Sequence, residues 1–92
     1  MPASTDSQPF SAATQIAIAD LAQRLGVAPS AITVVEVRTV VWPDGSLGCP
    51  RPGMLYPQVL KDGLLIRLMV QGREFAYHSG GARPPFLCEN RG

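Results

Sequence analysis

The sequence predicts an α+β domain in which an N-terminal helix packs on a three- to four-stranded antiparallel sheet, with one disulfide. Three features predict this fold: an apolar stripe at helical spacing, two alternating segments that meet at Gln71-Gly72, and two cysteines far apart in the chain. A chain of 92 residues has room for one such domain. We expect it to cover residues 10–90, and we expect residues 1–9, which have linker composition, to form a disordered tail.

Composition limits the partners that the chain can have. Hydrophobic residues make up 46% of the sequence, charged residues 16%, and the net charge is +1. The basic residues are scattered, so we expect no nucleic-acid partner, and no segment is apolar enough to span a membrane. We expect a monomer without a cofactor or a metal; its partner is unknown, and a protein is one candidate.

The first element is a helix over residues 11–25. Its apolar stripe follows the spacing i, i+3, i+4 and i+7, and consists of Ile18, Leu21, Ala22 and Leu25. Gly26 follows where a left-handed C-terminal cap is needed, and Val27 can fold back onto the last turn.

The second element is a strand over residues 32–42, which are mostly β-branched. Its two ends are out of phase, because Val37 belongs to one alternation and the pair Val40 and Trp42 to the other. A β-bulge near Arg38-Thr39 is expected to reconcile them.

Residues 64–70 and 73–78 form a predicted hairpin, since Gln71-Gly72 suits a two-residue turn. That register pairs Val70 with Arg73 and gathers one apolar face, made of Leu64, Ile66, Leu68, Val70, Phe75 and Tyr77. The opposite face is half polar. The helix is expected to lie across the apolar face.

Cys49 and Cys88 are the only cysteines, and three interpretations compete. A disulfide between them would close a loop of about 40 residues and stabilise the domain by about 4 kcal/mol in the chain-entropy model. Free buried thiols would fit a cytosolic location. A metal site or a catalytic thiol would need His78 as a partner, and further ligands or an orienting group are not evident. The size of the chain favours the disulfide.

The segment from Trp42 to Gln58 reads WPDGSLGCPRPGMLYPQ and is stiffened by its prolines. Residues 43–46 predict a type I turn with Trp42 in its first position. One interpretation is a rigid crossover pinned by Cys49, with Trp42 and Tyr56 packed in the core. The other is a preorganised binding loop. Its candidate residues are Trp42, Asp44, Arg51, Met54, Leu55, Tyr56 and, from the hairpin, His78.

His78 ends the second hairpin strand on the less apolar face. We expect a half-exposed residue that forms a hydrogen bond with the following turn. The alternative is a ligand or an acid–base group near Cys88.

The pattern WPDGSLGCP at residues 42–50, then PGM, then FAYH ending at His78, then LC ending at Cys88, resembles a family of small uncharacterised bacterial domains that tend to be exported or lipoprotein-like. Phe75 departs from the family, which has Tyr there. The resemblance implies an extracytoplasmic location and no particular activity. No export signal is present in the sequence, so the alternatives are a cytosolic protein and an exported domain whose signal has been removed.

The function that fits these features best is a non-enzymatic, extracytoplasmic binding or accessory domain of unknown ligand, since no catalytic motif is present. One alternative is a protease inhibitor that uses the rigid loop of residues 48–56. Another is a small Cys/His or metal-dependent enzyme. A cytosolic interaction module with two free thiols is a further alternative, which a mass measurement of the unreduced protein would distinguish.

Overall fold

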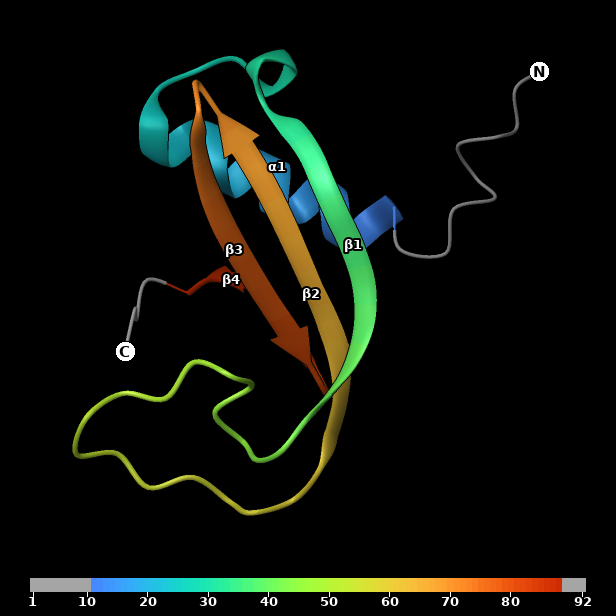
Figure 1. The fold of residues 1–92 in the computed structure, drawn as a ribbon, viewed down its shortest axis with the longest axis vertical. Coiled ribbons are helices and arrows are strands. Elements are labelled where there is room, and N and C mark those ends of the chain that lie inside the picture. Colours follow the sequence, from blue (N-terminus) through green and yellow to red (C-terminus); the bar gives the residue numbers. More distant parts are fainter. Residues whose placement is uncertain (1–10, 89–92) are drawn as a thin grey trace.

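The computed structural model describes residues 11–88. Within them the elements follow the order α1 (Ser11–Leu25), the short 3₁₀ helix η2 (Pro29–Ala31), β1 (Thr33–Trp42), β2 (Lys61–Val70), β3 (Arg73–Gly80) and β4 (Arg83–Leu87). The strands form one antiparallel sheet in the order β1-β2-β3-β4, and α1 crosses one face of it near one end (Figure 1). This confirms the predicted fold class. The tail expected over residues 1–9 lies outside the described residues, and the domain bounds stay a prediction.

α1 has the predicted bounds and the predicted cap. Gly26 takes a left-handed φ of 68°, and the Val27 N–H donates to the Ala22 carbonyl at 3.1 Å, which is the bond that closes a Schellman motif. Leu21 and Ala22 are buried as expected, whereas Leu25, beside the cap, is exposed.

The predicted hairpin of β2 and β3 is confirmed, including its register. Val70 pairs with Arg73, and the turn residues Gln71 and Gly72 both have positive φ, at 51° and 80°. That combination belongs to a type I′ turn, whose twist matches that of the strands. The apolar face forms the main core together with α1; its buried members are Ala17, Leu21, Ala22, Ile32, Ile66, Leu68, Val70 and Tyr77.

A hydrogen bond from Tyr77 anchors α1 to this core. The Tyr77 hydroxyl donates to Oδ2 of Asp20 at 2.7 Å. Burial first, and then this hydrogen bond, raise the pKa of Tyr77. Burial tends to raise the pKa of Asp20, but the hydrogen bonds from Arg24 and Tyr77 outweigh it and lower that pKa.

The bulge predicted near Arg38-Thr39 is wrong: the register of β1 against β2 shifts between Val34 and Glu36 instead. Skipping Val35 places Glu36 opposite Arg67, and Nη1 of Arg67 donates to Oε1 of Glu36 at 2.6 Å. The bulge therefore allows an ion pair on the face opposite α1.

The out-of-phase ends of β1 have a different cause. Beyond the bulge the strand is regular, so Val37 and Trp42 point to opposite faces of the sheet. Val37 packs against the core under α1. Trp42 packs on the other face, where the segment 43–60 folds over the end of the sheet that α1 leaves uncovered (Figure 1). Thus α1 covers one face of the sheet near one end, and the segment 43–60 covers the other face near the opposite end.

The predicted disulfide joins this segment to the last strand. Cys49 and Cys88 are bonded, with their Cα atoms 5.8 Å apart. The Cys88 N–H also donates to the Ala76 carbonyl at 2.9 Å, which fixes one end of the bridge to β3. Among residues 11–88 no helix has the length and hydropathy that crossing a membrane requires.

Candidate functional site

The loop between β1 and β2 starts at an aromatic stack. Trp42, the last residue of β1, lies on the His78 imidazole with ring centroids 4.6 Å apart and an interplanar angle of 11°. Its indole N–H donates to the Ser79 carbonyl at 2.8 Å. Both contacts hold the start of the loop on β3, so Trp42 packs on the sheet, half-buried and outside the main core under α1.

His78 is buried, contrary to the half-exposed residue expected at the end of a strand. Its side chain lies under the loop, and Nδ1 is 2.7 Å from the Leu47 carbonyl oxygen. Since a carbonyl only accepts, the proton is assigned to Nδ1, which donates. The residue is buried because β3 continues to Gly80 and because the loop returns over it.

Asp44 organises the inner part of the loop. Its Oδ1 accepts from the Ser46 N–H at 2.9 Å and from the Ser46 hydroxyl at 2.5 Å. These bonds, the hydroxyl first, lower the pKa of Asp44. The Leu47 N–H donates to the Asp44 carbonyl at 3.2 Å, so the turn runs from Asp44 to Leu47 and does not begin at Trp42 as predicted.

Two glycines let the backbone approach the indole of Trp42. A Cβ on Gly48, which has φ 76°, would lie 2.3 Å from Cζ3 of Trp42. A Cβ on Gly63 would lie 2.5 Å from Nε1 of the same ring and 2.0 Å from the Ser79 carbonyl oxygen. Packing within the fold therefore explains most of the sequence from Trp42 to Cys49. We call residues 42–49 the inner half of the loop.

The outer half of the loop, residues 50–60, presents apolar side chains to solvent. Four of them are exposed, namely Met54 at 57%, Leu55 at 96%, Val59 at 55% and Leu60 at 70%. No described residue covers Leu55. This part of the loop lies at the end of the molecule far from α1 (Figure 1).

Backbone bonds hold the outer half in place. The Gly45 N–H donates to the Pro57 carbonyl at 2.8 Å, tying it to the inner half. The Met54 N–H donates to the Arg51 carbonyl at 3.2 Å, and the half-buried Tyr56 accepts from the Arg51 N–H at 3.1 Å through its hydroxyl. The exposed side chains thus project from a braced segment.

The candidate binding residues separate into two groups. Trp42, Asp44 and His78 make contacts within the fold, whereas Arg51 and Met54 face solvent; Tyr56 braces the outer half. The sequence pattern did not single out Val59 and Leu60. A signal was present, because these two residues are an adjacent apolar pair within a loop. Neither a strand alternation nor a helical spacing explains apolar residues at those positions.

The two sulfurs are bonded to each other, so neither Cys49 nor Cys88 carries a thiol in this state. The His78 imidazole contacts the Leu47 backbone carbonyl and the Trp42 indole. In the described part of the chain, no three His, Cys, Asp or Glu side chains gather as they would around a metal ion.

Comparison with known proteins identifies the family. The family model of a domain of unknown function, DUF8738, matches residues 14–88. The chain belongs to the DUF8738 family. The DUF8738 match runs from the first turns of α1 to Cys88, so it includes the whole sheet, the loop and both cysteines. No curated protein and no solved structure matches the chain.

Proposed function

We propose that this DUF8738 domain is a non-enzymatic, extracytoplasmic binding domain that contacts a protein partner through the outer half of its loop. The observation that carries the proposal is the exposure of Leu55, at 96%, in a segment braced by Gly45, Tyr56 and the disulfide. Gathered apolar side chains on a soluble domain are typical of interaction sites. A braced loop also loses little conformational entropy when it binds.

The chemistry of the outer half favours an apolar cleft on a protein. Arg51 is its one charged residue, and Lys61 follows at the start of β2. A loop that inserts into an anionic membrane surface normally has several cations beside its apolar residues. Tyr56 is the one aromatic residue of the outer half, and its hydroxyl accepts a hydrogen bond from the Arg51 backbone N–H.

The disulfide supports the proposed location. Structural disulfides persist in oxidising compartments and are rare in the cytosol. The Cys49–Cys88 bridge fixes the boundary between the two halves of the loop, so its reduction would loosen the segment that is proposed to bind.

Proteases are one class of partner with a suitable cleft, and the side chains of Arg51, Met54 and Leu55 are accessible to one. Trypsin-like and subtilisin-like proteases are assayed with the domain in excess. Inhibition that is abolished by Leu55→Ser or Arg51→Ser would identify proteases as the partner class. Undiminished protease activity at micromolar concentrations of the domain would exclude them.

The proposal itself is tested by photo-crosslinking. A photoreactive amino acid is placed at Leu55, and in a matched protein at Gln23, an exposed polar position on α1. Both proteins are irradiated in an extract of the cells that make the domain and in anionic vesicles. One dominant protein adduct from position 55, absent from position 23 and suppressed by excess unlabelled domain, is expected. Equal adducts from both positions, or adducts with lipid alone, would overturn the proposal.

A further inference from the structure

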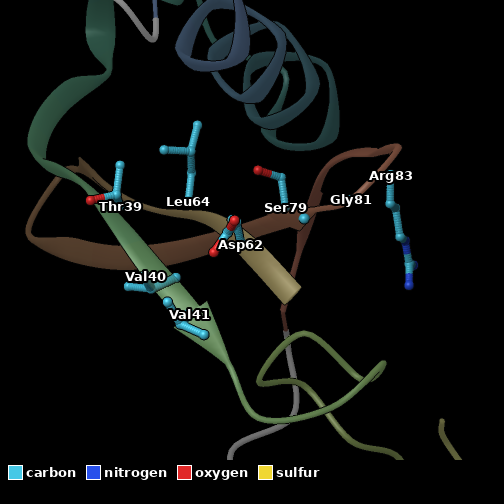
Figure 2. Close-up of a pocket in the computed structure, with 10 residues that line it drawn as sticks. Thr39, Val40, Val41, Asp62, Leu64, Ser79, Gly81 and Arg83 are labelled. Atoms are coloured by element: carbon cyan, nitrogen blue, oxygen red, sulfur yellow. The ribbon is translucent and has the colours of Figure 1, made fainter. Parts of the chain in front are cut away.

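A second candidate site lies on the opposite face of the sheet from the loop, beyond the part that α1 covers. It is a groove of about 600 Å³, lined by side chains and backbone of all four strands (Figure 2). This volume is within the range of small-molecule sites. Leu64 and Val41 supply apolar surface, and Val41 is 59% exposed.

Ser79 supplies a polar group on the groove face. The residue is only 7% exposed, and its hydroxyl makes no hydrogen bond with any described residue. Figure 2 shows this hydroxyl on the same side of the sheet as the Leu64 side chain, toward α1. No buried side-chain oxygen of the described residues lacks a hydrogen-bond partner, so this unpaired hydroxyl is open to the groove, where a ligand can form a hydrogen bond with it.

Asp62 supplies the charge. It pairs with Val41 in the sheet register and lies two residues from Leu64, so its side chain belongs to the groove face. Its carboxylate has no ion pair or hydrogen bond among the described residues. A carboxylate beside an accessible apolar surface recognises a cation that can donate hydrogen bonds.

The nearby cations belong to the other face. Arg83 is among the residues that line the groove, but its guanidinium carbon lies 3.7 Å from the centroid of Phe86, which pairs with His78 on the loop side. Figure 2 shows the Arg83 side chain running away from the groove. Lys61 pairs with Trp42 and shares its face. The charge that faces the groove is therefore the negative charge of Asp62.

We propose that this groove binds a small organic cation, an alkylammonium with an apolar body. The ammonium donates to the Asp62 carboxylate and to the Ser79 hydroxyl oxygen, and the alkyl part lies over Leu64 and Val41. This site is separate from the outer half of the loop, so either proposal can fail while the other stands.

The test uses three probes with the same alkyl chain: hexylammonium, 1-hexanol and hexanoate. Each is titrated into the isotope-labelled protein, and amide NMR shifts are followed. We expect saturable shifts around Leu64, Ser79 and Gly81, with hexylammonium binding at least about tenfold tighter than hexanol and hexanoate weakest. Equal affinities for the three probes, shifts centred elsewhere, or no saturation by about 10 mM would overturn the proposal.

Variants assign the contacts. Asp62→Asn is expected to remove the preference for the ammonium, and Ser79→Ala to weaken it severalfold. Both preserve the backbone bonds, since the Gly81 N–H donates to the carbonyl of residue 62 and Trp42 to the carbonyl of residue 79. Glu74→Gln, at an ion pair away from the groove lining, is the control and should bind as the wild type does. Retained preference in Asp62→Asn with a native spectrum would also overturn the proposal.

Discussion

The indole of Trp42 stacks on the buried imidazole of His78, with ring centroids 4.6 Å apart, and so joins the first residue of the loop to the third strand. Nδ1 of His78 in turn donates to the Leu47 carbonyl. This arrangement makes the inner half of the loop part of a second, smaller core on the face opposite α1. The outer half is then displayed from a fixed base, which is why the two halves should respond differently to mutation.

Two glycines of the loop provide a matched pair that tests the packing on Trp42. Gly48 and Gly53 have φ of 76° and 80°, but a Cβ would collide with the indole at Gly48 and meet nothing within 4 Å at Gly53. Gly53→Ala should cost about 1–2 kcal/mol for the left-handed conformation alone. Gly48→Ala should cost a further 1–3 kcal/mol or so for overpacking. Urea unfolding of both variants measures the difference, and equal costs would refute the close approach.

Leu47 and Leu55 provide a second matched pair, one from each half of the loop. Leu47 is 4% exposed and Leu55 is 96% exposed. Leu47→Ala should destabilise the domain by about 2–5 kcal/mol because it leaves a cavity. Leu55→Ala should change the stability by less than about 0.5 kcal/mol. Thermal unfolding measures both changes. A comparable loss of stability in the two variants would show that the Leu55 side chain packs within the fold and does not project into solvent.

The disulfide should carry a large share of the stability. The bridged cysteines are 39 residues apart, and a closed loop of this size contributes about 4 kcal/mol in the chain-entropy model. Reduction, or the double variant Cys49→Ser/Cys88→Ser, should lower the urea midpoint by the corresponding amount. A reductant should not shift the double variant further, which controls for other effects. An unreduced mass equal to that of the dithiol would contradict the bridge.

The acid dependence of stability should include a contribution from Asp20. Its pKa is lowered in the fold by hydrogen bonds from Arg24 and Tyr77 that outweigh its burial, so ionised Asp20 favours the native state. That stabilisation is fully present above the unfolded pKa of about 4 and is lost as the pH falls through the lower folded pKa. Because the Asp20 side chain is still 37% exposed, solvent screening should keep the effect below about 1 kcal/mol. The advantage of the wild type over Asp20→Asn at about pH 7 should shrink at about pH 3; an advantage that grows would contradict the assignment.

The elements with local signals could be predicted from the sequence. Gly26 and Val27 mark the end of α1, and Gln71-Gly72 sets the register of the hairpin, because each signal depends on neighbouring residues. The disulfide followed from the size of the chain and its two cysteines.

Features that depend on distant contacts could not be predicted in the same way. Alternation in β1 predicts one buried face, whereas Val37 and Trp42 are covered on opposite faces by different parts of the chain. The burial of His78 depends on Leu47, far away in the sequence. In the candidate site, the local signal at residues 43–46 did indicate a turn that contains Asp44, whose carboxylate bonds to Ser46 two residues away. The exposure of Arg51 and Met54 leaves the binding-loop hypothesis a prediction.

The affinity of the protein captured at Leu55 tests the central claim most directly. The purified partner is titrated against the wild-type domain, Leu55→Ser and the control Gln71→Ser, which changes an exposed residue of the hairpin turn at the other end of β2. The account predicts at least about a tenfold loss of affinity for Leu55→Ser, with unchanged stability, and none for Gln71→Ser. Equal affinity of all three proteins would contradict it.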